Sequence, residues 1–384
     1  MFAAIKNGIV QCVCDKPFTM EDADVFESQE ITNKNIGQRY KEKNNGLKVA
    51  FVTNWNVPCG ISTFASYLVD ELSKYVEVKI FAEKHNNNLL ELDDKSVIRC
   101  WKRNNKMDGC VEEIRKYNPN IIFTNFEWGL INNGSHLLKY IQDISAYPNV
   151  FITHSVWPEH HDKNMILATM DNIIVHSESA KQALIDDGVN CPIYYIPHGR
   201  FLPETHAKPW NILKRQQKII TYGFLFDYKK IETIIDAIEI LKAKYPEILF
   251  ICFASHSGYF NNIHANCYQK LLQRVNDKKL QDNIVILSGF FSNKTLKYYL
   301  LSSNICVFSH EAEVLGASGS VSLPLKYQVP VIASGRTKQF EDFNNILPQP
   351  STPEELAIEI DRFLSDKEYI KNQIEKQNLR IIEN

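Results

Sequence analysis

The sequence predicts an α/β protein with two domains, each built on a parallel sheet covered by helices. Three observations support this prediction. The 384 residues exceed what one compact core normally organises. Short apolar runs alternate with amphipathic stretches, as in parallel sheets with helical crossovers. The alternation stops once, at about 200–216, where two prolines stand in a stretch without apolar periodicity, and then it restarts.

The first domain is predicted from the apolar run LKVAFVT at 47–53, which is typical of a strand buried on both faces. Pro58 and Gly60 then break the chain before a helix. We expect the buried face of that helix to consist of Phe64, Tyr67, Leu68 and Leu72. Further strands are expected at 76–82, 120–126, 149–155, 172–177 and 192–199, with helices at 107–117, 134–144 and 178–188.

The second domain repeats this pattern. Its expected strands are 218–224, 248–254, 283–289, 305–310 and 329–334, and its expected helices include 230–245, 267–279 and 293–303. The period of residues 352–384 is also helical. We therefore predict an N-terminal extension without an assigned role, two domains and a C-terminal helix whose packing on the first domain is left open, with boundaries at 1–46, 47–208, 209–365 and 366–384.

Charge and composition exclude several classes of protein. Lys and Arg (43) nearly balance Asp and Glu (45), which argues against a nucleic-acid-binding protein. No apolar run approaches the roughly 20 residues of a membrane-spanning helix, and no signal peptide is evident. The nine cysteines show no repeated C-x-x-C pair, so we expect reduced thiols and a cytoplasmic protein, with peripheral membrane contact and oligomeric state left open.

A turn of small residues, Ser318, Gly319 and Ser320, precedes an expected helix. Amide groups at the start of a helix point outward and attract phosphate, which makes this turn a candidate donor site. The alternative is an ordinary N-cap, for which serine is favoured.

Two lysines, Lys229 and Lys230, stand where another helix is expected to begin, after a strand that ends at Gly223. Cations oppose the dipole at a helix N-terminus, so the pair suggests a compensating anion. The alternative is solvated surface charge.

Polar residues also follow strands of the first domain, where parallel sheets present ligand-binding groups. They are Gly60, Ser62, Thr63, Glu127, Trp128 and His154. Each could instead be hydrogen-bonded locally. The segment PEHHD at 158–162 lacks the i, i+4 histidine spacing of a helical zinc site, so no metal site is predicted.

With these stretches in place, the sequence resembles family 4 glycosyltransferases of the GT-B fold, which use nucleotide sugars and retain anomeric configuration. The resemblance rests on an ordered set of motifs across about 47–345: CGISTF, NFEWGL, FITHSV, IIVHSESAKQAL, IPHG, YGFLFDYKKIETIIDAI and SGSVSLPLKYQVPVIAS. It implies two Rossmann-like domains facing each other across a cleft.

The resemblance also implies roles for the matched positions. Catalytic roles fall to Lys229, His154 and Glu313; donor binding to Gly60, Gly223, Lys229, Lys230, Glu311, Glu313, Ser318, Gly319 and Ser320; acceptor-side contacts to Ser62, Thr63, Glu127 and Trp128. Lys229 matches the family lysine on the donor diphosphate, and no cofactor or metal is implied. The expected partners are a nucleotide-sugar donor and a glycan or glycoconjugate acceptor, with no nucleic acid.

The sequence departs from the family pattern at three positions. The position at which many members carry the second of two glutamates falls on or near Leu323, and Glu311 or Glu313 could replace the first. Phe224 replaces a common arginine, and Lys230 replaces a common glycine. The resemblance as a whole still implies a retaining, metal-independent, hexosyltransferase-like enzyme. The alternatives are a sugar- or nucleotide-binding protein that has lost turnover and a sugar-nucleotide epimerase.

Overall fold

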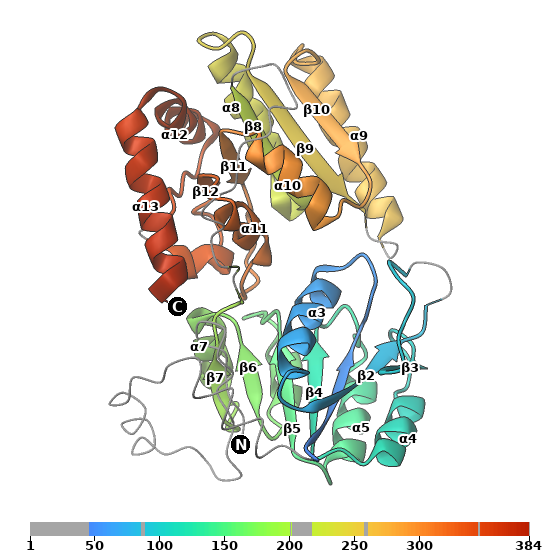
Figure 1. The fold of residues 1–384 in the computed structure, drawn as a ribbon. Helices are drawn as coiled ribbons and strands as arrows, with labels where there is room; N and C mark the ends of the chain where they lie inside the picture. The colour runs from blue at the N-terminus through green and yellow to red at the C-terminus, as the bar shows by residue number, and fades with distance from the viewer. Residues whose placement is uncertain are drawn as a thin grey trace. The chain divides into compact units, whose positions relative to one another are not determined.

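The structure is a computed structural model, drawn in Figure 1, in which the chain divides into two compact units, Met1–Pro197 and His198–Asn384. It describes residues 46–85, 89–199, 201, 217–256, 260–344 and 346–383. The predicted extension, apart from Gly46, and part of the predicted interdomain stretch lie outside the described residues.

Unit 1 contains a seven-stranded parallel sheet in the order β3-β2-β1-β4-β5-β6-β7. Its strands are β1 (Lys48–Thr53), β2 (Glu77–Glu83), β3 (Val97–Trp101), β4 (Ile121–Phe126), β5 (Asn149–Thr153), β6 (Ile173–Val175) and β7 (Ile193–Tyr195). Chain order reverses between β1 and β4, so this pair marks the point of the sheet where ligands usually bind.

Helices cover both faces of this sheet because successive residues of a strand point to opposite sides. The helices are α3 (Gly60–Leu72), α4 (Asp108–Tyr117), α5 (Gly134–Ile144), α6 (His161–Leu167) and α7 (Glu178–Asp186). Helix α3 packs on the side of Phe123, whereas Tyr140 of α5 packs on the side of Thr124 and Phe151.

The prediction for the buried face of α3 is wrong for one of its four residues, Tyr67. Leu72 is buried and Phe64 and Leu68 pack against the core, but Tyr67 is 41% exposed. The helix turns Ser62, Ala65 and Val69 inward instead, so the apolar ring of Tyr67 misled the sequence-based choice of face.

Unit 2 contains a five-stranded parallel sheet in the order β10-β9-β8-β11-β12. Its strands are β8 (Lys218–Phe224), β9 (Leu249–Ser255), β10 (Ile284–Ser288), β11 (Ile305–Phe308) and β12 (Val331–Ala333). The order reverses between β8 and β11, the equivalent of β1 and β4.

The helices of unit 2 also divide between two faces. They are α8 (Ile231–Lys242), α9 (Asn261–Asp277), α10 (Asn293–Leu301), α11 (Ser322–Lys326), α12 (Pro353–Ser365) and α13 (Lys367–Glu383), with 3-10 turns η1 (Asp227–Lys229), η2 (Gly319–Val321) and η3 (Lys338–Phe343). One core joins α8, α9 and α12 to the sheet, and the other joins α10, α11 and η3 to the opposite face.

The predicted C-terminal helical stretch is two helices separated at Asp366. Helix α13 contacts β12 of its own unit, where the buried Gln377 side chain accepts the Val331 amide hydrogen at 3.2 Å and donates to the Val331 carbonyl at 3.2 Å. These two bonds satisfy the backbone of β12 at its outer edge.

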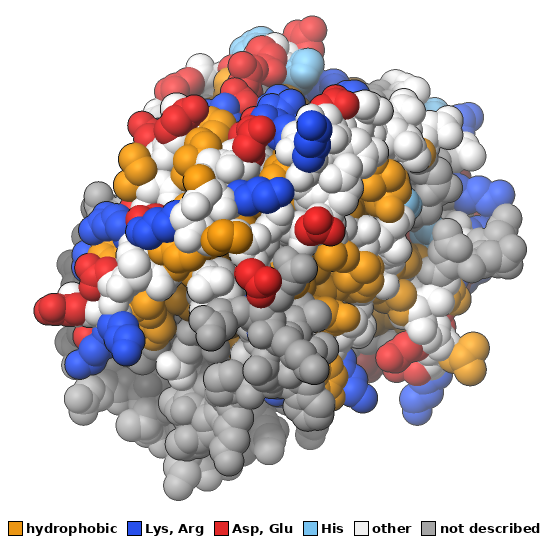
Figure 2. Space-filling view, turned by 90° about the horizontal axis from the view of Figure 1, so that it is seen from above, with side chains coloured by type: hydrophobic (Ala, Val, Ile, Leu, Met, Phe, Trp, Pro, Cys, Tyr) orange, Lys and Arg blue, Asp and Glu red, His pale blue; other side chains and the backbone are white. Residues whose placement is uncertain are grey.

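The surface mixes charges of both signs, as the face drawn in Figure 2 shows. Within the described residues, no helix combines the length and hydropathy needed to span a membrane. The seven described cysteines are free thiols, as expected: Cys59, Cys100, Cys110, Cys191, Cys252, Cys267 and Cys306.

Candidate functional site

The candidate donor site of unit 2 lies at the carboxyl end of its sheet, where β8 and β11 are neighbours. Lys229 comes from η1 just after β8, and His310 follows β11 by two residues. The Lys229 Nζ atom lies 2.9 Å from His310 Nε2. The topology therefore brings together two residues 81 positions apart at the reversal point of the sheet.

The hydrogen bonds around His310 define its tautomer. Its Nδ1 lies 3.0 Å from the side-chain oxygen of Gln339, which can only accept, so Nδ1 carries the proton. Nε2 then has a lone pair and accepts a hydrogen from the Lys229 ammonium. Two hydrogen bonds in series, one on each nitrogen of the His310 ring, thus connect Gln339 to the Lys229 amine.

Burial changes the acid–base behaviour of both groups. Burial lowers the pKa of Lys229 to about 7. Burial, followed by the nearby Lys229 charge, holds the pKa of His310 well below its usual value. His310 is therefore neutral at physiological pH, as its accepting role requires, and Lys229 gains from any anion that restores its charge.

The backbone around Lys229 leaves room for its amine beside the end of β8. Gly223 has a φ of 138°, and a Cβ at that position would lie 3.7 Å from Lys229 Nζ. Lys230 adopts a left-handed conformation with a φ of 45°, a region that favours glycine. The hydroxyl of Ser309 bonds to the carbonyls of Lys229 and Lys230 at 2.8 and 2.7 Å and fixes this turn.

The 318–320 turn begins a short helical segment, η2 followed by α11. The Ser318 amide donates to the Gln339 carbonyl at 3.0 Å, so it is engaged within the protein. The tyrosine hydroxyl of Tyr222 donates to the Ser320 carbonyl. The amides of Gly319 and Ser320 then stand at the helix start, where no intrahelical acceptor precedes them.

The imidazole of His198 lies against this turn. A Cβ added to Gly319 would come within 2.7 Å of His198 Cε1, so only glycine allows this approach. The turn therefore presents backbone and an imidazole side by side, both suited to hydrogen-bond a phosphate.

Two predicted carboxylates and one arginine complete this region. Glu311 Oε2 lies 3.2 Å from Arg336 Nη1 and 3.9 Å from Lys230 Nζ. Arg336 also donates to Thr233 Oγ1 at 3.2 Å. Glu313 is exposed. Glu311 therefore neutralises part of the cationic cluster formed by Lys230 and Arg336. Glu313 forms none of the ion pairs described for this cluster.

In unit 1, the candidate residues meet around a buried asparagine. Asn125, at the end of β4, donates from Nδ2 to Thr53 Oγ1 at 3.0 Å and to the Ile61 carbonyl at 3.3 Å. Its Oδ1 lies 2.6 Å from His154 Nε2, which must therefore carry the proton. Phe64 packs edge-on against the imidazole of His154, with ring centroids 4.8 Å apart. His154 is thus held in one tautomer and one orientation.

Glu127 follows the same strand. Burial raises the pKa of its carboxyl to about 7, although hydrogen bonds from Ser155 and from the amides of Trp128 and Gly129 oppose the increase. Trp128 itself is 6% exposed and packs on Phe126, so it lies in the core. Glu127 is therefore the titratable group of this loop.

The glycine loop places its three predicted residues differently. Gly60 begins α3, is exposed, and has no atom near the position of an added Cβ. Ser62 is buried, with its hydroxyl accepting the Val57 amide at 3.2 Å. Thr63 bonds back to the Cys59 carbonyl at 3.1 Å. Ser62 and Thr63 shape the loop, and Gly60 leaves its surface open.

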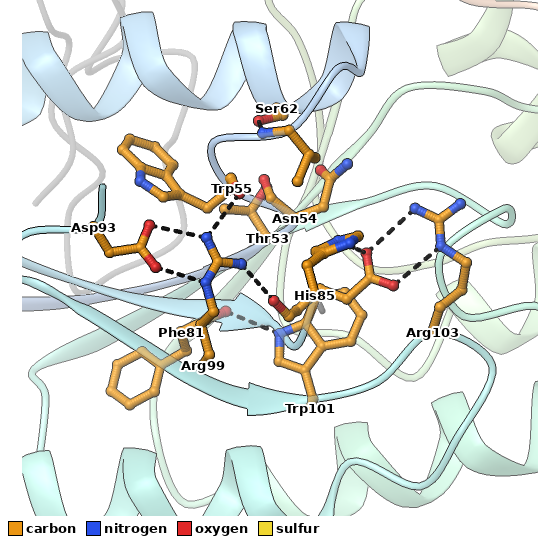
Figure 3. A network of polar contacts seen from close by, with 12 residues as sticks. Thr53, Asn54, Trp55, Ser62, Phe81, His85, Asp93, Arg99, Trp101 and Arg103 are labelled. Carbon is orange, nitrogen blue, oxygen red and sulfur yellow. Dashed lines mark hydrogen bonds and ion pairs between the residues drawn. The ribbon is translucent and has the colours of Figure 1, made fainter. Parts of the chain in front are cut away.

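An ionic network beside this loop fixes it to the neighbouring strands (Figure 3). The guanidinium of Arg99 binds Asp93 at 2.6 and 2.9 Å, the Glu83 carbonyl at 2.6 Å and the Trp55 carbonyl at 3.2 Å. The buried Glu83 carboxylate receives bonds from Arg103 at 3.3 Å and lies 3.1 Å from His85 Nε2. These partners anchor the residues that follow β1.

Asn54, also drawn in Figure 3, is fully buried next to this network, and neither polar atom of its side chain has a partner among the described residues. We predict that Asn54→Leu raises the free energy of unfolding by about 1 kcal/mol, because a similar-sized apolar group removes two unsatisfied atoms. Thermal unfolding measures this. The control is Asn125→Leu, which breaks three bonds and should destabilise; equal destabilisation by both changes would contradict the prediction.

The sequence analysis missed four residues of these sites: Asn125, His310, Arg336 and Gln339. Three of them directly follow or end predicted strands, so their position at a strand end was the available signal. Gln339 follows no strand closely, and its bonds to residues 318 and 310 depend on tertiary structure alone.

Part of the chain matches a known protein family. Residues 204–380 match the family described as glycosyl transferases group 1. That range covers most of unit 2, including every donor-site residue described above except Gly60 and His198. The match supports sugar transfer as the activity. A search of the curated proteins gave no match.

Solved glycosyltransferase structures share the fold. HepE of Anabaena in complex with UDP-glucose superposes with a TM-score of 0.66 at 15% identity, over 87% of this chain and 94% of HepE. Sucrose-phosphate synthase of Thermosynechococcus elongatus gives 0.69 at 18% identity, over 88% and 94%. A glycosyltransferase of Rickettsia africae gives 0.66 at 18%, over 88% and 94%. The α/β class with two Rossmann-like units of the GT-B type is confirmed.

Proposed function

We propose that this protein is a retaining glycosyltransferase that moves a hexose from a nucleoside-diphosphate sugar to an acceptor hydroxyl without a metal ion. The observation that carries the proposal is the connection between Lys229 and the 318–320 turn. Gln339 links to Lys229 through His310 and to Ser318 through its own carbonyl. A cation and a helix start are thus built into one hydrogen-bonded unit.

Breaking the bond between sugar and diphosphate creates negative charge on the leaving group. Preorganised donors that face this charge lower the barrier, and they act most strongly where water is excluded. Lys229 would supply the positive charge, and the amides of Gly319 and Ser320 would supply neutral donors. Binding the diphosphate also restores the charge that burial makes costly for Lys229.

The sugar and acceptor contacts follow from the remaining residues. Glu311 lies in the cationic cluster and Glu313 is exposed two residues further on, and we assign both carboxylates to accept hydrogen bonds from sugar hydroxyls. His154 donates its Nε2 proton to Asn125, so this nitrogen cannot accept a proton, and we assign the residue contact with the sugar and not proton removal. Glu127, whose pKa burial raises to about 7, would accept a hydrogen bond from the hydroxyl group of the acceptor sugar or glycoconjugate. We place the protein in the cytoplasm.

The donor to test first is a uridine nucleotide sugar. HepE, which shares the fold, has been solved with UDP, with UDP and glucose, and with UDP-glucose. The base and the sugar are proposals for this chain, since unit 2 provides diphosphate contacts that do not select either.

The test is a panel of UDP, GDP and ADP sugars incubated with glycan and lipid-linked acceptors, with release of the free nucleoside diphosphate as the readout. Thermal-shift measurements with the same nucleotides report binding without turnover, because a bound ligand stabilises the folded state. The proposal fails if the protein neither binds a nucleotide nor releases one across the panel.

A non-catalytic binding protein is the second candidate, and one observation favours it. Leu323, at the position of the second family glutamate, is 5% exposed and belongs to the apolar core of α11. The site therefore lacks one carboxylate contact for the donor. Nucleotide binding without product would identify this function, whereas a changed donor sugar without acceptor use would identify an epimerase.

A further inference from the structure

Gln339 uses its side chain and its main chain for two different parts of the candidate donor site. Its Oε1 accepts the proton of His310 Nδ1 at 3.0 Å. Its carbonyl accepts the Ser318 amide at 3.0 Å. Through these two bonds one residue reaches both groups that the proposed function assigns to the diphosphate: Lys229, by way of His310, and the 318–320 turn.

We propose that Gln339 is a positioning residue for the nucleotide-sugar donor, holding the Lys229 amine and the 318–320 turn at a fixed separation. This inference rests on the proposed function and adds a residue that touches neither donor nor acceptor. It differs from the roles of Lys229 and the turn because Gln339 acts only through them.

The side chain of Gln339 determines whether the His310 Nε2 atom, which faces Lys229, is a hydrogen-bond acceptor or carries a proton. An amide oxygen at Nδ1 keeps the proton there, so Nε2 stays an acceptor. Without that oxygen, the proton can move to Nε2. Two hydrogen-bond donors, the Nε2 proton and the lysine ammonium, would then face each other and could form no bond. The lysine would then lose its only described hydrogen-bond acceptor and turn away from its place beside Gly223.

The position of Gln339 is itself secured by its surroundings. Its amide donates to Thr337 Oγ1 at 3.2 Å, capping η3. The next residue, Phe340, is fully buried, and its ring centroid lies 4.9 Å from that of His310. Gln339 itself is only partly buried, so changing its side chain leaves this anchor in place.

The main experiment compares UDP affinity, measured by calorimetry at pH 6.5, in the full-length wild-type protein and in Gln339→Leu. Leucine is similar in size and keeps the main-chain bond to Ser318. We expect about 10-fold weaker binding, since one charge-assisted hydrogen bond loses its orientation. Gln349→Leu is the control, because this glutamine of the same segment bonds to Asn344 at 3.1 Å and contacts neither His310 nor Ser318.

A second readout separates positioning from simple loosening of the site. An amine-selective reagent modifies only neutral lysine, so the pH at which Lys229 becomes reactive reports its ionisation in the ligand-free protein. Loss of the His310 acceptor should move this midpoint to lower pH in Gln339→Leu, and further in Gln339→Glu, whose carboxylate favours an imidazolium with a proton on Nε2. Loosening would expose Lys229 to water and move the midpoint upward.

The outcomes distinguish the inference from the proposed function. Weaker UDP binding with a lower midpoint in Gln339→Leu supports positioning. Unchanged UDP binding, or an upward midpoint, overturns it while the proposed function stands. If wild-type protein binds none of UDP, GDP and ADP, the proposed function is wrong and the role of Gln339 falls with it.

Discussion

Replacing Lys229 with methionine should lower the rate of donor cleavage by about 100-fold or more, the largest effect expected of any single change in this protein. Methionine keeps the length of the side chain but removes the charge that faces the leaving diphosphate. Loss of one preorganised donor to a developing anion typically costs this much in turnover. The measurement is release of nucleoside diphosphate at saturating donor and acceptor concentrations.

The control is Lys244→Met, a lysine two residues beyond the end of α8 that pairs with Asp361 at 2.7 Å on the surface. Its activity should equal that of the wild type. The effect of Lys229→Met on kcat and on KM should be measured separately. Loss of a charge that acts mainly in the transition state lowers kcat, whereas loss of a contact that binds substrate and transition state equally raises KM alone. A rate equal to the wild type in Lys229→Met would remove this lysine from the mechanism.

The strands could be predicted from the sequence because most of them are buried on both faces and therefore read as apolar runs. The missed strand, β3 (Val97–Trp101), lies at the edge of the sheet and carries Arg99 in its middle. Its charge breaks the apolar pattern, and only the pairing with Asp93 and the carbonyls of Glu83 and Trp55 explains why it is tolerated there. Local pattern cannot reveal such long-range compensation.

The helix boundaries show the same limit. Helix α9 begins at Asn261, six residues before the expected start at Cys267, because its first turns are rich in Asn and His and lack an apolar period. The seven-residue helix α6 (His161–Leu167) contains part of the PEHHD segment and was not expected at all. Short polar helices depend on packing by neighbours such as α5, which sequence patterns do not record.

Only part of the candidate donor site could be predicted from the sequence. Lys229 and the 318–320 turn have local signals, a cation and small residues at helix starts. His310 and Gln339 have none, because a buried histidine normally indicates core packing, and their hydrogen bonds span 81 and 29 residues of sequence. The structure therefore adds the hydrogen bonds that support Lys229 and the turn, and it adds the burial that lowers the pKa of Lys229 to about 7.

Donor affinity should be highest below about pH 6 and fall about 10-fold from that plateau by pH 8. Burial lowers the pKa of Lys229 to about 7, so the free protein loses the lysine charge as pH rises through this value. The diphosphate binds the charged form and raises the pKa in the complex, so binding takes up a proton above pH 7. A nucleotide sugar is a suitable ligand, because its diphosphate has no proton to lose in this range. Calorimetry between pH 6 and 9 measures the profile.

The neighbouring groups allow the titration to be assigned to Lys229. Burial and the nearby Lys229 charge hold the pKa of His310 well below its usual value, so His310 stays neutral over this range. Glu127 also has a pKa of about 7 but belongs to unit 1, so Glu127→Gln should keep the decline if Lys229 causes it. Lys229→Arg, which stays charged, should flatten the profile. A decline that persists in Lys229→Arg and disappears in Glu127→Gln would assign the pH dependence to the carboxylate instead.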